Sequence, residues 1–243
     1  MSDLLESGTI TPEASELLKM LVKAGYNIFV SGGTSSGKTT FLNVLSEFIP
    51  KDERVIVIED SAELQITGIE NIIRLECKNA NVQGKGEISI RQLIKASLRM
   101  RPNRIIVGEV RGAEVLDMIQ AMNTGHDGSL STGHGNSPEG MLSRIEAMFL
   151  QAADFPVDAI RSQIAEAIDI IVHLGKLPDK TRKVLEITEI EGYYDGRICM
   201  NPLFQYKANA SVHSNGGASN GLLIPTGNQL KNTLKLERNG IYI

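Results

Sequence analysis

A glycine-rich stretch near the start of the chain has the residue types and spacing needed to bind phosphate. It reads GGTSSGKT over residues 32–39, which fits the pattern G-x-x-x-x-G-K-[ST] of a phosphate-binding loop. Its glycines let backbone N–H groups turn toward phosphate oxygens, its lysine can reach the β- and γ-phosphates, and its last hydroxyl suits a magnesium ligand. The alternative, a chance match, is disfavoured by the strand-like run before the loop and the helix-like run after it. The predicted nucleotide-binding residues are Gly32, Gly33, Thr34, Ser35, Ser36, Gly37, Lys38, Thr39 and Thr40, with Lys38 also catalytic and Thr39 a magnesium ligand.

Two acidic residues stand where such a loop would need them. Hydrolysis of a bound nucleotide requires a carboxylate for the metal and a group that orients water. Glu59 follows the apolar run RVIVI, and Glu109 follows RIIVG. Strand ends in a parallel sheet meet at the edge where the phosphate loop lies. Acids at strand ends are often simply solvated, but beside a phosphate loop we favour catalytic roles for both, with Glu109 also on magnesium, directly or through water.

One histidine has a setting that suits the same edge. The stretch GSLSTGHGNS, residues 128–137, places His134 at the end of a strand-like run among small residues. Small neighbours leave an imidazole room to donate a hydrogen bond to a γ-phosphate. We therefore interpret His134 as a γ-phosphate sensor, with a structural histidine as the alternative. The remaining histidines, His126, His173 and His213, lack this setting and are expected to be structural or exposed.

A basic stripe follows from the spacing of Arg91, Lys95 and Arg99, which recur every four residues and so share one helical face. Further arginines come soon after, at positions 101, 104 and 111. The sequence leaves two interpretations open. The stripe is either a solvated helix face, or it contacts phosphate or a neighbouring subunit's nucleotide as an arginine finger would.

The pattern of elements that must position these residues is that of an α/β domain. A first helix is predicted to begin at Thr11-Pro12, with Thr11 as N-cap, and to end at Gly25. Short apolar runs then alternate with amphipathic ones, which implies crossover connections and a mainly parallel sheet with helices on both faces. After about residue 168 strand-like runs are joined by short turns, so antiparallel edge strands are expected.

The C-terminal part differs in composition. We assign residues 1–206 to one catalytic domain, and residues 207–221 to a flexible linker because they are small and polar. Residues 222–243 are expected to form a tail with a short helix that carries Leu230 and Leu234 on one side.

Composition limits the classes of protein to consider. The 243 residues are 42% hydrophobic and carry a net charge of −4, which gives no support to stable nucleic-acid binding. Two cysteines cannot build a disulfide framework; reduced thiols are favoured, with one oxidised pair as the alternative. The sequence shows no apolar run of membrane-spanning length and no signal-peptide pattern, so a cytoplasmic protein is expected.

Taken together, these motifs closely resemble the ATPases of type II and type IV secretion systems. The resemblance rests on SGGTSSGKTTFLNVL, IEDSAELQ, SLRMRPNRIIVGEVRG, AMNTGHDGSLSTGHGNSPEGMLSRIEAM and AIDIIVHL, which occur in this order between about residues 7 and 206. The nearest group is CpaF, which powers assembly of tight-adherence (type IVb) pili. The resemblance implies a RecA-like P-loop fold and an ATPase that uses ATP and Mg²⁺, working as a hexamer at the cytoplasmic face of the inner membrane.

The resemblance also assigns roles to residues. It places Glu59 in the aspartate box as the residue that activates water, Glu109 in the second acidic motif and His134 in the histidine box. It points to Arg74 and Arg99 as arginines that contact phosphate or a neighbouring subunit, and Arg101, close by in the sequence, is a further candidate for such a contact. Family members carry an N-terminal domain, so this chain is expected to be a short member or a fragment.

Three functions remain open at this level. The first is a motor that hydrolyses ATP for pilus assembly or protein secretion and works with an inner-membrane platform protein. The second is a nucleotide-gated module for ring assembly with little turnover. The third is a DNA-transfer ATPase of the conjugation type, since that branch shares the fold.

Overall fold

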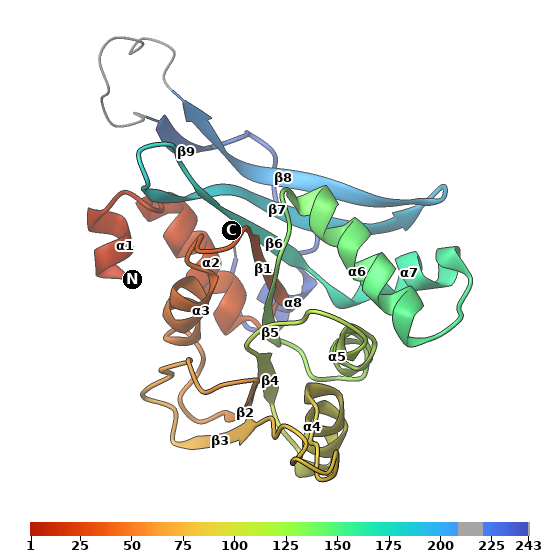
Figure 1. Cartoon of the computed structure of the whole chain (residues 1–243). Helices are drawn as coiled ribbons and strands as arrows, with labels where there is room; N and C mark the ends of the chain where they lie inside the picture. Colours follow the sequence, from red (N-terminus) through yellow and green to blue (C-terminus); the bar gives the residue numbers. More distant parts are fainter. Residues whose placement is uncertain (209–220, 243) are drawn as a thin grey trace.

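The computed structural model describes residues 1–208 and 221–242. Within them, nine strands form one sheet in the order β3-β2-β4-β5-β1-β6-β7-β8-β9 (Figure 1). The strands are β1 (Ile28–Gly32), β2 (Arg54–Glu59), β3 (Asn71–Glu76), β4 (Arg104–Val107), β5 (Leu130–Gly133), β6 (Ile170–Lys176), β7 (Arg182–Tyr194), β8 (Arg197–Ala208) and β9 (Gly221–Pro225). The helices are α1 (Ser2–Glu6), α2 (Pro12–Lys23), α3 (Lys38–Ser46), α4 (Ile90–Ser97), the short 3-10 helix η1 (Leu98–Met100), α5 (Glu114–Asn123), α6 (Pro138–Ala152), α7 (Val157–Ala167) and α8 (Leu234–Arg238).

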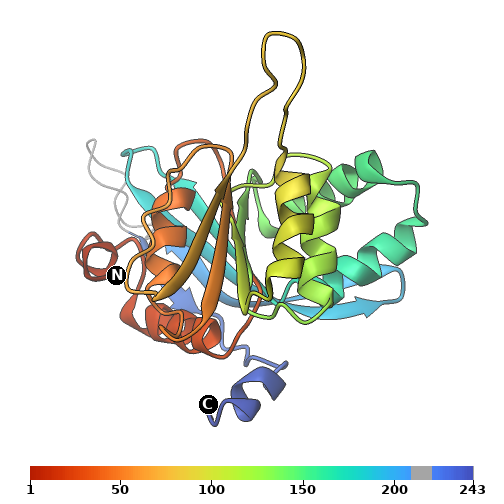
Figure 2. The same cartoon turned by 90° about the horizontal axis from the view of Figure 1, so that it is seen from below.

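The strands from β3 to β6 in this order are parallel to one another. Strands β1, β2, β4 and β6 are mostly apolar and buried, as expected where helices cover both faces of a sheet (Figure 2). On one face, α2 and α3 pack through residues such as Leu18 and Phe41. On the other face, α4 to α7 pack through residues such as Ile94, Met118 and Ile145. The predicted fold class, a mainly parallel sheet between two layers of helices, is confirmed.

The first helix follows the sequence prediction closely. Thr11 occupies the N-cap with extended backbone, Pro12 is the first helical residue, and the helix ends at Lys23, just before Gly25. Its buried face comprises residues such as Leu18, Leu21 and Val22. In the described residues no helix is long and apolar enough to cross a membrane.

The C-terminal strands β6 to β9 are antiparallel, as expected from their short connections. Strand β9 pairs Gly221 with Ala208 and Pro225 with Phe204, so the described chain after the gap continues the sheet. Most of the predicted linker, residues 209–220, lies outside the described residues. Its two ends belong to β8 and β9.

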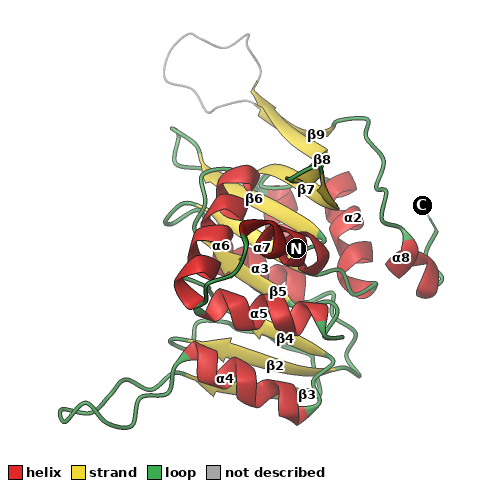
Figure 3. Ribbon diagram, turned by 90° about the vertical axis from the view of Figure 1, so that its right-hand side faces the viewer, coloured by secondary structure: helices red, strands yellow, loops and turns green. Residues whose placement is uncertain are grey.

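The tail beyond β9 forms the short helix α8, which lies beside the end of α2 (Figure 3). The buried residues are Leu230 and Leu236, whereas Leu234 is 56% exposed. The predicted apolar pair therefore has Leu236 in place of Leu234, because the helix begins only at Leu234 and turns Leu236 toward the core.

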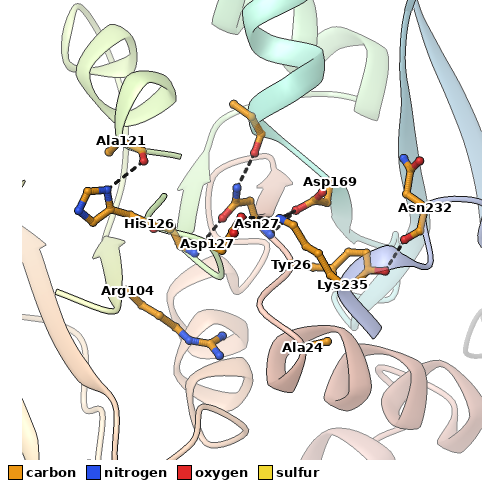
Figure 4. Close-up of polar contacts among 12 residues, drawn as sticks. Ala24, Tyr26, Asn27, Arg104, Ala121, His126, Asp127, Asp169, Asn232 and Lys235 are labelled. Atoms are coloured by element: carbon orange, nitrogen blue, oxygen red, sulfur yellow. Dashed lines mark hydrogen bonds and ion pairs between the residues drawn. The ribbon is translucent and has the colours of Figure 1, made fainter. Parts of the chain in front are cut away.

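Polar contacts fasten this tail to the amino ends of the parallel strands (Figure 4). Lys235 Nζ lies 2.7 Å from carboxylate oxygens of both Asp127 and Asp169. The hydroxyl of Tyr26 donates to the backbone carbonyl of Asn232. Residues 26, 127 and 169 precede β1, β5 and β6, so the tail covers the edge of the sheet opposite to the phosphate loop.

Candidate nucleotide site

The loop 32–39 connects β1, in the middle of the sheet, to α3 (Figure 1). Gly37 caps the helix with a φ of 96°, a left-handed conformation that favours glycine. Lys38 follows as the first helical residue and is buried, with Nζ donating to the carbonyls of Gly32 at 3.2 Å and Gly33 at 3.1 Å. Burial lowers the pKa of Lys38, while the charge of Glu109 opposes that shift. A buried cation at a helix N-terminus is an arrangement that attracts phosphate.

The two predicted acids meet on one side of this loop. Glu59 ends β2 and is 5% exposed, and its Oε1 accepts from the backbone N–H groups of Glu63 at 2.9 Å and Leu64 at 2.8 Å. Glu109 lies two residues beyond the end of β4. Thr39, Glu59 and Glu109 line one cavity of about 260 Å³. The structure therefore brings together the residues that the sequence placed at three separate strand or helix ends.

His134 lies between Lys38 of the phosphate loop and Glu109. Its Nε2 lies 2.8 Å from Oε1 of Glu109, and its Nδ1 lies 3.4 Å from Nζ of Lys38. Burial and the positive charge of Lys38 lower the pKa of His134, and Glu109 raises it. The net lowering keeps the ring neutral at neutral pH, so one nitrogen can donate and the other accept. The other oxygen of Glu109, Oε2, accepts from Arg111 Nη2 at 2.6 Å and Nε at 2.8 Å.

The donor set around this cavity fits magnesium. The Thr39 hydroxyl and the Glu109 carboxylate line the same cavity, together with Asp60 and Glu63. Oxygen ligands from a hydroxyl, a carboxylate and phosphates are those that Mg²⁺ prefers. Thr39 and Glu109 would hold the ion, with Glu59 close enough to share the cavity.

A second cavity, of about 310 Å³, lies on the other side of the phosphate loop. Apolar residues Leu4 and Phe41 line it, and so does Arg182 from the start of β7. Arg182 Nε donates to the carbonyl of Ser35 at 2.9 Å and so holds the loop from across the sheet. Sequence reasoning missed Arg182, because it stands 147 positions from Ser35 and no local pattern marks it. The mixed apolar and polar lining can accept a nucleoside.

Of the three candidate arginines, Arg74 lies apart from Arg99 and Arg101. Arg74, on β3, donates to the carbonyls of Leu64 and Ile66, both at 2.8 Å, and so braces the segment that follows Glu59. Arg99 and Arg101 are exposed just before β4 begins. They stand at the opposite end of that strand from Glu109, so the structure does not bring them to the phosphate loop of their own chain.

Two residues of the basic stripe, Arg91 and Lys95, pair with an acid of the same chain. Arg91 Nε lies 2.6 Å from Oδ2 of Asp117, and Lys95 Nζ lies 3.5 Å from its Oδ1, across the α4–α5 contact. Arg104, the first residue of β4, is buried and pairs with Glu53, which directly precedes β2. These residues fasten elements to one another, and only Arg111 of the later arginines reaches the candidate site in the described chain.

Of the other histidines, His173 lies beside the phosphate loop and His126 does not. His126 lies outside the site, with Nδ1 3.2 Å from the carbonyl of Ala121 (Figure 4). His173 is buried in β6 beside the phosphate loop, 3.1 Å from the hydroxyl of Ser31. His213 lies outside the described residues. Cys77 and Cys199 are free thiols.

Comparison with known proteins identifies the family of this chain. Residues 1–222 match the profile of the family described as type II/IV secretion system protein. The chain belongs to this family. This type II/IV secretion family member is 38% identical to the type IV secretion system protein PtlH of Bordetella pertussis over 182 residues, which is 73% of this chain and 54% of PtlH. It is 34% identical to the conjugal transfer protein TrbB of Rhizobium radiobacter over 196 residues, 79% of this chain and 57% of TrbB.

The fold of this secretion family member also matches a solved structure. The VirB11 ATPase from the Brucella suis type IV secretion system, solved in complex with sulphate, superposes with a TM-score of 0.66 at 32% identity. The match covers 79% of this chain and 54% of that chain. The RecA-like fold expected from the resemblance is confirmed. The chain spans a little over half the length of the relatives it matches.

Proposed function

We propose that this chain binds ATP or ADP with Mg²⁺ at residues 32–40, hydrolyses ATP, and supplies the energy for pilus assembly or protein secretion. The contact between His134 and Glu109 at 2.8 Å, beside the buried amine of Lys38, carries the proposal. It joins Lys38 of the phosphate loop, through His134 at the end of β5, to the acid that follows β4, at the point where a γ-phosphate would lie. The family supports the same class of activity.

In this mechanism each residue of the site has one task. Lys38 exchanges its carbonyl partners for the β- and γ-phosphate oxygens. Thr39 and Glu109 would hold Mg²⁺, which would neutralise charge on the phosphates. Glu59, fixed through its Oε1, orients the attacking water and takes its proton as the bond from the γ-phosphorus to the bridging oxygen breaks. The neutral ring of His134 has one N–H, which faces Glu109 in this structure. With ATP bound, this N–H donates to a γ-phosphate oxygen instead, so the site distinguishes ATP from ADP.

Assembly into a ring is part of the proposal. Arg99 and Arg101 are exposed at the edge opposite to the phosphate loop, where a neighbouring subunit of a hexamer could receive them. Arg74 is engaged with the backbone, so it acts through the segment that follows Glu59. We assign catalysis to residues 1–206, and place the protein in the CpaF group, on the cytoplasmic face of the inner membrane beside a platform protein.

The name of one relative, conjugal transfer protein TrbB, favours a second candidate, a DNA-transfer ATPase. The net charge of −4 gives direct DNA binding no support. A third candidate is a nucleotide-gated module for ring assembly with little turnover. A measurement of ATP hydrolysis distinguishes this module, which turns over little ATP, from both motors. A measurement of binding to DNA fragments at low salt distinguishes the DNA-transfer ATPase, which should bind them, from the pilus or secretion motor.

Glutamine substitutions at the two acids test the catalytic proposal. Glu109→Gln and Glu59→Gln each preserve shape but remove the carboxylate charge. We expect both variants to bind ADP as the wild type does and to release phosphate at less than about a hundredth of its rate. Glu16→Gln, on the exposed face of α2, is the matched control and should hydrolyse ATP normally. Near-normal turnover in both site variants would exclude these roles.

A further inference from the structure

A second histidine lies directly behind the candidate site, on β6. His173 is paired in register with Ser31, the residue that precedes the phosphate loop on β1. Its Nδ1 lies 3.1 Å from the hydroxyl of Ser31, and both side chains are buried. Ser31 is also paired with Gly133 on its other side, in β5. One hydroxyl therefore stands between the strand that carries His173 and the strand that leads to His134.

The ring of His173 also reaches the turn that follows His134. The backbone of Asn136 lies near the ring and favours its protonated form, although burial lowers the pKa of His173 overall. The same turn packs closely on β1, since a Cβ at Gly135 would lie 2.7 Å from the hydroxyl oxygen of Ser31. A side chain at position 135 would therefore push the turn away from the phosphate loop. His173 thus ties together the phosphate-loop strand and the turn of residues 134–136.

The position of the turn determines where the His134 ring lies. That ring contacts Glu109 and Lys38, both on other segments. Its backbone belongs to the turn that packs on Ser31. A shift of the turn by about 1 Å is enough to weaken a hydrogen bond to a γ-phosphate. A neutral imidazole can accept from one partner and donate to the other, which suits a residue that must hold both Ser31 and Asn136.

We propose that His173 is a positioning residue, which holds the turn of residues 134–136 so that His134 contacts the γ-phosphate and the site prefers ATP to ADP. The inference rests on the nucleotide function proposed above. It gives His173 a role through His134 and none in contact with substrate. The effect of His173 should be confined to the γ-phosphate position. ADP has no γ-phosphate, so His134 has nothing to bind there when ADP occupies the site.

The test compares two nucleotides in the full chain. His173→Leu removes the hydrogen bond to Ser31 and the polar contact with the backbone of Asn136, and places an apolar side chain of similar size in the buried position. The affinities for ADP and for a non-hydrolysable ATP analogue are measured by calorimetry with Mg²⁺. We expect ADP affinity to stay within about twofold of wild type and analogue affinity to fall about fivefold, the worth of one ordinary hydrogen bond.

A double variant separates positioning from a general structural role. If His173 acts through His134, then His173→Leu should not change the ratio of the two affinities further in a His134→Ala background. A purely structural histidine would lower both affinities equally in the single variant, or its effect would add to that of His134→Ala. Either result would overturn the proposal.

Ser31→Ala provides a second route should His173→Leu fail to fold. It removes one partner of the His173 ring, and we expect a smaller loss of analogue affinity with unchanged ADP affinity. An unchanged ratio of affinities in Ser31→Ala would then count against the inference. The wild type and Lys38→Ala keep the two proposals apart. Wild-type nucleotide binding that Lys38→Ala weakens about thirtyfold upholds the phosphate-loop site. An unchanged preference for the analogue in His173→Leu, with wild-type binding intact, overturns the role of His173 alone.

Discussion

Substitution of Lys38 by alanine should weaken nucleotide binding without harming the fold. The Lys38 amine is buried and now donates to two carbonyls, at 3.2 and 3.1 Å. On binding it exchanges these for phosphate oxygens, and charge-assisted hydrogen bonds contribute about 1.5–3 kcal/mol each. The exchange leaves a net gain of about 2 kcal/mol, which corresponds to about a thirtyfold loss of affinity in Lys38→Ala. Burial lowers the pKa of Lys38, so burying its charge is unfavourable and removal should not reduce stability.

The assay is calorimetric titration with Mg-ADP, together with thermal unfolding of both proteins. Lys51→Ala, an exposed lysine in the segment between α3 and β2, serves as the control and should bind ADP as the wild type does. Unchanged ADP affinity in Lys38→Ala would refute the assignment of the phosphate loop. A fall in affinity accompanied by a fall in melting temperature would refute the reasoning about the buried charge.

Three further outcomes follow from other contacts. His134→Ala should bind ADP normally and an ATP analogue about fivefold more weakly; equal losses for both nucleotides would indicate a structural histidine. Arg104→Met leaves Glu53 and the carbonyl of Val22 without their buried partner, so urea unfolding should show a loss of about 3 kcal/mol; a loss under 1 kcal/mol would contradict this. Burial lowers the pKa of His173 below 6.5, so the unfolded chain binds more protons just below pH 6.5, and the free energy of unfolding should rise with pH there. That slope should be smaller in His173→Gln than in wild type, and an unchanged slope would count against a neutral buried ring.

The phosphate loop could be predicted from the sequence because its signal is local. The spacing of glycines, lysine and threonine over residues 32–39 is contained in one turn between a strand and a helix. The positions of Glu59 and Glu109 followed from a general property of parallel sheets, in which the carboxyl ends of strands share one edge. The same reasoning put His134 at that edge, and the structure places it between Lys38 and Glu109.

Contacts between distant segments could not be predicted in this way. Arg182 holds the carbonyl of Ser35, and His173 contacts Ser31, across separations of 147 and 142 residues. Helical periodicity correctly gathered Arg91 and Lys95 on one face, but their shared partner is on another helix. Periodicity shows which side chains point together and contains no information about what faces them.

The tail shows a related limit. The sequence indicated a short helix with an apolar side, but the choice between Leu234 and Leu236 depended on where the helix begins. That start is set by contacts of the preceding residues, whose N–H groups at positions 231 and 232 donate to the buried carboxylate of Glu189. When a contact with a distant residue fixes where a helix begins, the local sequence pattern does not show that boundary. The residues that form the apolar face then differ from those that the pattern predicts.

Phosphate release from ATP, measured across a dilution series of the wild type with Mg²⁺ or with EDTA, tests the central claim most directly. An arginine from a neighbouring subunit acts only when chains associate, so release per chain should rise with protein concentration. It should require Mg²⁺ and be lost in Lys38→Ala at every concentration. Release that persists in EDTA or in Lys38→Ala, or no release at any concentration from protein that binds ATP, would contradict an ATPase at this site.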